Sequence, residues 1–209
     1  TFTAGLNFYY MNYHDQLVLN GKQSDVGGKL SENVASSHRM GAELNASWKI
    51  CPMLRWDLAG AVSKNQIKQY HLYAWSEQTE KDVLTTYDRT PIAYSPQLVL
   101  SNTLTFAHQA FEAALTSQYV GMQYLDNTGS RERSLPAYHV ASLRLGYELP
   151  VHFVRSWSIS LQINNLFDAR YSSNGGAGYT FDKKGAISSY TWTYPQAGIH
   201  AFLGTTITI

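Results

Sequence analysis

The sequence is poor in charge and in cysteine, and it has no long hydrophobic run. Charged residues make up 15% of the 209 residues, and 16 basic against 15 acidic side chains give a formal net charge of +1. This balance argues against nucleic-acid binding through a basic surface. The single cysteine, Cys51, excludes an internal disulfide and a cysteine-based zinc site. No stretch of 18 apolar residues occurs, which excludes membrane-spanning helices but not membrane-spanning strands.

The amino end also lacks an initiator Met, a positively charged region and an apolar signal core, so we expect a mature segment and not a precursor.

The dominant pattern in the sequence is the alternation of apolar and polar residues. It is clearest between Arg39 and Ile50, where Leu44 and Trp48 stand on one face of a strand and Glu43 on the other. We count about eight such strands of roughly 10 residues each, the length of a tilted membrane strand. They cover 2–11, 39–50, 54–63, 98–106, 111–119, 142–149, 157–167 and 199–209.

Short and long connections alternate between these strands. The short ones lie near Cys51, near His108 and at 150–155, and the long polar ones at 20–37, 70–94, 126–138 and 172–194. This asymmetry predicts an all-β fold, an antiparallel transmembrane β-barrel, with short periplasmic turns, long extracellular loops and a periplasmic carboxyl end at Ile209. A soluble β-sandwich is the alternative, but the strands are too long for it.

Charged residues on the polar faces of the strands leave two architectures open. In a wide barrel they contact an internal domain, whereas in a closed eight-stranded barrel they pair across a packed interior. These residues are Glu43, Lys49, Arg55, Asp57, Glu112 and Arg144.

Two motifs near the carboxyl end carry a specific resemblance. Residues 164–171 read NNLFDARY (Asn164, Asn165, Leu166, Phe167, Asp168, Ala169, Arg170 and Tyr171), and 194–198 read YPQAG (Tyr194, Pro195, Gln196, Ala197 and Gly198). This pair resembles the last two strands of TonB-dependent outer-membrane receptors. The stretches 12–22, 62–67 and 119–129 are similar to the Bacteroidetes branch of that family.

The resemblance implies a plug domain inside a barrel of 22 strands, of which residues 1–209 form the carboxyl-terminal part without the plug. It also implies the partners: the outer-membrane lipid bilayer, the plug and earlier strands, the TonB complex reached through an amino-terminal region, and the barrel-assembly machinery. That machinery reads the closing strand, where Gly204 matches the family but Ile207 and Ile209 replace aromatic residues. The implied function is active import of a scarce metal chelate, with a ferric siderophore favoured over haem or cobalamin and over the carbohydrate-importing branch. No cofactor is implied.

Ligand-contacting residues are expected in the loops and on the upper wall, where Arg pairs with anionic chelates and Tyr or Trp lies flat on them. The candidates are His14, His38, Arg39, His71, Tyr73, Trp75, Tyr87, Arg89, Arg131, Arg133, His139, Tyr179 and Trp192. The seven histidines show no repeated spacing, so no metal site is predicted. No arrangement of nucleophile, base and acid predicts catalysis. A self-contained eight-stranded barrel with a structural or adhesion role is the alternative function.

Overall fold

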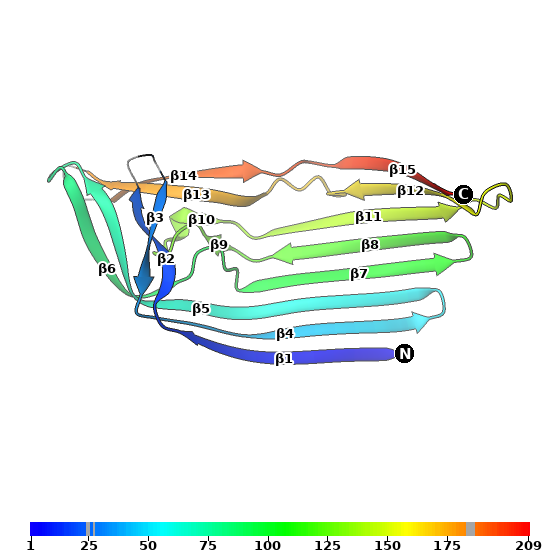
Figure 1. Cartoon of the computed structure of the whole chain (residues 1–209), viewed down its shortest axis with the longest axis horizontal. Coiled ribbons are helices and arrows are strands. Elements are labelled where there is room, and N and C mark those ends of the chain that lie inside the picture. Colours follow the sequence, from blue (N-terminus) through cyan, green and yellow to red (C-terminus); the bar gives the residue numbers. More distant parts are fainter. Residues whose placement is uncertain (24–25, 27, 183–186) are drawn as a thin grey trace.

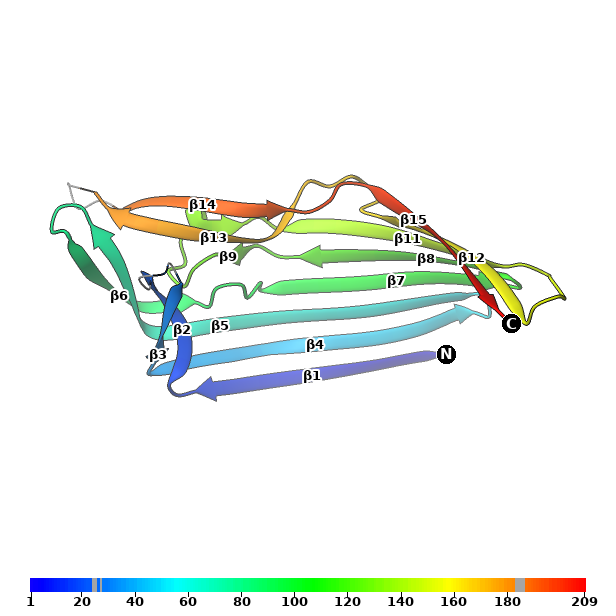
Figure 2. The ribbon, with the colours of Figure 1, turned by 45° about the horizontal axis from the view of Figure 1, so that its top comes forward.

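The computed structural model describes residues 1–23, 26, 28–182 and 187–209, and its main feature is one curved antiparallel sheet (Figures 1 and 2). Eight strands lie side by side in this sheet, and they confirm the eight predicted from alternation. In order they are β1 (Phe2–Tyr13), β4 (Ser36–Cys51), β5 (Leu54–Ser76), β7 (Leu98–His108), β8 (Phe111–Val120), β11 (Tyr138–Glu148), β12 (Ser156–Asn164) and β15 (His200–Thr208). Among the described residues, no helix is long and apolar enough to cross a membrane.

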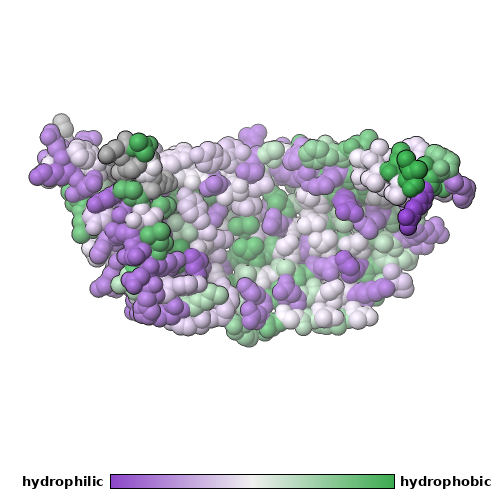
Figure 3. All heavy atoms as spheres, in the orientation of Figure 1, coloured by the Kyte–Doolittle hydropathy of each residue, from purple (hydrophilic) through white to green (hydrophobic). Residues whose placement is uncertain are grey.

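The strand register aligns the two faces predicted from the sequence. Leu6 stands opposite Leu44, and Leu104 opposite Leu115, so the apolar rows of neighbouring strands join into one outward face. This face is open to its surroundings, since Leu6 is 61% and Leu203 78% exposed. The other, inward face carries the polar row, in which Asn7 donates a hydrogen bond to Glu43 at 3.2 Å. Figure 3 shows hydrophilic and neutral residues over much of one face of the molecule.

Oppositely charged side chains on the inward face form ion pairs with each other. Arg55 Nε lies 2.7 Å from Asp57 Oδ2, and Arg144 Nη2 lies 3.1 Å from Glu112 Oε1. Both pairs connect neighbouring residues of the wall and stay partly exposed, so they do not cross a packed interior. This arrangement fits the wide-barrel interpretation.

The sheet does not close on itself, because β1 and β15 form its two opposite edges. The alternative of a self-contained eight-stranded barrel requires these two strands to pair, and in this structure they do not. Open edges expose unpaired backbone groups, which a bilayer does not tolerate. The open sheet therefore agrees with the expectation of a larger barrel, in which further strands would cover both edges.

The long polar connections predicted from the sequence are present, and they are built mostly from hairpins, which the sequence analysis did not predict. β2 (Gln16–Gln23) pairs with β3 (Lys29–Val34), the end of β5 with β6 (Lys81–Pro91), and β13 (Ser172–Phe181) with β14 (Ile187–Pro195). The short β9 (Gln123–Tyr124) and β10 (Ser134–Leu135) flank the 3-10 turn η1 (Arg131–Arg133). All four units gather at one end of the sheet, which we call the loop cap, while both chain termini lie toward the other, turn end (Figure 1).

The buried hydrophobic cluster lies in the loop cap, where the end of β5 packs against β2 and β3. Val18, Val34, Ile67, Tyr70 and Leu72 are at most 7% exposed and pack together with Ile92. β5 contributes both Ile67 and Tyr70 because Gln69, at φ +53°, interrupts the alternation between them. The loop cap is therefore a packed unit with its own core.

The two recognised motifs have a structural role where the chain passes from β12 to β13 and from β14 to β15. Asn165 is buried, and its side-chain amide donates to the carbonyl oxygens of Ala169 at 2.9 Å and Ala197 at 3.1 Å. Its Oδ1 accepts the Ala169 amide at 2.8 Å, and Asp168 Oδ1 accepts the Ile199 amide at 2.9 Å. The motifs thus hold the end of one strand against the start of the last.

Candidate functional site

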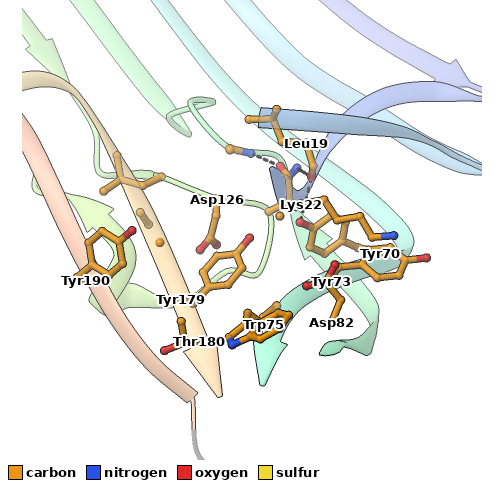
Figure 4. Close-up of a pocket in the computed structure, with 17 residues that line it drawn as sticks. Leu19, Lys22, Tyr70, Tyr73, Trp75, Asp82, Asp126, Tyr179, Thr180 and Tyr190 are labelled. Carbon is orange, nitrogen blue, oxygen red and sulfur yellow. Dashed lines mark hydrogen bonds between the residues drawn. The ribbon is translucent and has the colours of Figure 1, made fainter. Parts of the chain in front are cut away.

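The loop cap encloses a cavity of about 300 Å³ (Figure 4). Its walls come from β2, β5, β6, β13 and β14 and from the segment around Asp126. These elements are far apart in the sequence and meet where β13 joins β5 in a short parallel pairing, with Thr180 opposite Trp75. The volume lies at the lower end of the range for small-molecule pockets.

Aromatic side chains dominate the cavity wall. Tyr70, Tyr73 and Trp75 come from β5, Tyr179 from β13 and Tyr190 from β14. Burial, together with the nearby Asp126 carboxylate, raises the pKa of the Tyr70 and Tyr179 hydroxyls, which both lie in the loop cap. These hydroxyls therefore stay protonated at neutral pH and can donate hydrogen bonds, as Tyr70 does to the Leu19 carbonyl oxygen at 3.0 Å.

Charged groups lie at two places around the cavity. The Lys22 ammonium stands 3.9 Å above the centroid of the Tyr73 ring, a cation–π contact. On the other side Asp126 forms an ion pair with Arg133 at 2.5 Å, and both side chains are less than 10% exposed. Arg133 also donates to the Thr128 hydroxyl at 2.7 Å and lies 5.6 Å from the Tyr179 ring centroid.

Polar cross-links hold the hairpins around the cavity in place. The Asn127 side chain accepts the Ala93 amide at 2.8 Å and donates to the Leu19 carbonyl oxygen at 3.3 Å. Tyr94 donates to the carbonyl oxygen of Gly175 at 3.0 Å. Since each bond joins segments distant in the sequence, the cavity is preformed by the fold of the loop cap.

Three of the predicted ligand residues, Tyr73, Trp75 and Tyr179, line this cavity, and Tyr87 packs against the core beneath it. Arg133 is buried in its ion pair, so it supports the wall. Sequence reasoning missed Lys22, Tyr70, Asp82, Asp126 and Tyr190. The high tyrosine content of the chain was the only feature of the sequence that pointed to Tyr70 and Tyr190.

The other predicted residues lie apart from the cavity. Arg39 faces inward and donates to Ser95 at 3.4 Å, and His71 Nδ1 lies 3.6 Å from Glu32 Oε1. Trp192 packs beside Tyr190, with ring centroids 5.8 Å apart. The remaining five are placed as follows: His14 follows β1, Arg131 is exposed in η1, and His38, Arg89 and His139 stand on the outward face.

The site offers recognition groups and not reactive ones. Among the described residues, no group of three or more His, Cys, Asp or Glu side chains is placed to hold a metal ion. Aromatic faces, protonated hydroxyls and one ammonium group can bind a flat ligand that carries polar substituents.

Comparison with known proteins identifies the fold. Residues 1–166 match the family model described as TonB dependent receptor-like, beta-barrel. A pesticin receptor of Yersinia enterocolitica is 25% identical over 169 residues, which cover 80% of this chain and 22% of that receptor. This chain thus spans about a fifth of the length of that relative.

Solved structures show the same fold at low identity. The siderophore receptor PiuA of Acinetobacter baumannii superposes with a TM-score of 0.69 at 16% identity, over 98% of this chain and 25% of that one. The ferric yersiniabactin uptake receptor FyuA of Yersinia pestis gives 0.62 at 18% identity, over 98% and 27%. These relatives are transport receptors and not enzymes. The chain belongs to the TonB-dependent receptor β-barrel family of the outer membrane.

Proposed function

We propose that this chain forms the closing part of the barrel of an outer-membrane receptor that imports a ferric siderophore. The observation that carries the proposal is the aromatic cavity in the loop cap, at the end of a polar inward wall. In a ferric siderophore the chelator already surrounds the iron, so a receptor needs no metal ligands of its own. Stacking surfaces and hydrogen-bond donors, which Tyr73, Trp75 and Tyr179 supply, are sufficient to hold such a ligand.

In this proposal the loop cap faces the outside of the cell, and the turn end, with Ile209, faces the periplasm. The inward wall lines the path and contacts the plug domain through partly exposed pairs such as Arg144 with Glu112. Energy reaches the plug from TonB through the amino-terminal region of the whole receptor. The barrel-assembly machinery reads β15, where Gly204 stands opposite Ser160 and Ile207 opposite Trp157.

The cavity is tested with the full-length receptor and a panel of ferric siderophores that differ in their aromatic groups. Replacing both Tyr73 and Trp75 by Ala removes two stacking surfaces, each worth about 0.5–1.5 kcal/mol, so affinity for the preferred chelate should fall by a factor between roughly 5 and 150. Isothermal titration measures the affinity, and uptake of radioactive iron measures transport. Haem and cobalamin are tested in the same way as alternative cargoes.

Tyr147→Ala is the matched control, because Tyr147 stands on the outward face of β11 near the turn end. It should leave chelate affinity unchanged. If the double variant binds every ferric siderophore as tightly as the unmodified receptor, the cavity is not the binding site.

A further inference from the structure

The outward face of the main sheet has a marked charge distribution. From β1 to β15, and along β5 as far as Gln69, its rows hold two formally charged residues, Lys64 and Lys68, and no acid. All eight strands lie within the described residues. Both lysines lie at the end of the face nearest the loop cap, directly beyond Val62.

A third cation joins them on β6. Arg89 stands opposite Lys68 in the antiparallel register, so the two side chains project from the same face. All three side chains are exposed, and the described residues place no carboxylate within ion-pair distance of any of them. Like charges directly opposite each other destabilise a sheet, and a bound anion would remove this repulsion.

The height of the cluster matches a membrane boundary. Ten residues separate Leu54, at the turn end of β5, from Lys64, which is about 33 Å along the strand and about 25 Å along the membrane normal at a tilt near 40°. The apolar band of such barrels is about 25 Å tall. Lys64 thus lies at the upper edge of the band and Lys68 about 10 Å above it.

Aromatic residues mark the same level. Tyr10 stands opposite Met40, which in turn stands opposite Lys64. The Tyr10 ring stacks on His38, with centroids 6.2 Å apart. Tyrosine in this position is typical of the girdle at a membrane interface.

We propose that Lys64, Lys68 and Arg89 bind the phosphate group of a phosphorylated lipid in the outer leaflet. Arg89 can bind two phosphate oxygens at once, and the lysines add point charges on either side. Because the cluster continues directly into the apolar rows at Val62 and Leu98, the acyl chains of the same lipid can lie against the sheet. The inference rests on the membrane orientation proposed above, but not on the identity of the cargo.

The test uses the full-length receptor in detergent and three forms of lipid A as probes: with two phosphates, with one and with none. Binding is measured by native mass spectrometry and by microscale thermophoresis. A cation near a phosphate surface contributes about fivefold to affinity, so the triple variant K64Q/K68Q/R89Q should bind bisphosphorylated lipid A roughly 100-fold more weakly. Lys81→Gln, at the exposed tip of the β5–β6 hairpin, is the matched control and should bind like the unmodified receptor.

Three further results decide the outcome. Binding by the unmodified receptor should weaken as sodium chloride is raised, and dephosphorylated lipid A should bind equally to all variants. The assignment is overturned if the triple variant, shown to be folded by heat-modifiable migration, keeps the full affinity, or if salt has no effect. Full displacement of lipid A by millimolar inorganic phosphate would exclude the lipid as the ligand and assign the site to free phosphate. Because no chelate takes part, a wrong cargo leaves every one of these readouts unchanged.

Discussion

Breaking the buried ion pair in the loop cap should loosen the wall of the cavity. The Arg133 and Asp126 side chains are 6% and 9% exposed, so Arg133→Met leaves a carboxylate without its partner in a site with little water. Loss of one member of a buried pair costs about 3–5 kcal/mol. Local opening of the segment should therefore become at least roughly 100-fold more frequent.

Hydrogen exchange at the Leu125 amide measures this opening, because that amide donates to the Arg133 carbonyl oxygen at 2.9 Å. Arg144→Met is the control, since its pair with Glu112 is more than 40% exposed on both sides and is worth less than about 1 kcal/mol. The double variant D126N/R133M should exchange more slowly than R133M, as no charge stays buried alone. Exchange in R133M within fivefold of the unmodified receptor would refute the reasoning.

Three further predictions concern other parts of the fold. Burial raises the pKa of the Tyr70 hydroxyl above the value of about 10 that it has in the unfolded chain. The protonated hydroxyl therefore stabilises the loop cap below a pH of about 10, and this contribution is lost as the pH rises above that value. Proteolysis of the loop cap should then become faster, and less steeply so in Tyr70→Phe. Asn165→Ala removes three buried hydrogen bonds, at about 1–3 kcal/mol for each group left unpaired, and should lower the midpoint of heat-modifiable unfolding more than Asn164→Ala does. Gly21→Ala places a Cβ 2.5 Å from a backbone oxygen of β5 at a φ of +90°, and should weaken chelate binding measured by titration, whereas Gly5→Ala meets nothing within 4 Å and should not.

The membrane part of the fold could be predicted from sequence because its physics is local. A strand between lipid and a polar interior must alternate, and the run from Met40 to Trp48 does so at every position. The faces seen in the register are those assigned from the pattern. The Bacteroidetes branch, by contrast, stays a prediction, since it rests on short motifs alone.

The loop cap could not be predicted in the same way, because its contacts join residues that are distant in the sequence. Val18 and Tyr70 share one core although more than 50 residues separate them. The reversal at Gln69 uses a positive φ that this residue type seldom adopts, so no turn signal marks it. A polar, long connection was therefore interpreted as a loop where the structure has a packed hairpin.

The candidate site shows the same division between residue type and placement. Composition pointed to Tyr73, Trp75 and Tyr179 because aromatic rings suit flat chelates, and all three line the cavity. Arg89 and Arg133 were chosen because Arg pairs with anionic chelates, yet one stands on the outward face and the other is buried against Asp126. The residue type determines what a side chain can bind. Its place in the alternation along a strand, and the packing of the hairpins, determine which groups it contacts. For Arg89 the alternation of side chains along the strand places the guanidinium opposite Lys68 on the outward face. In the orientation proposed above, the same anion-binding chemistry is therefore directed toward lipid and not toward imported cargo.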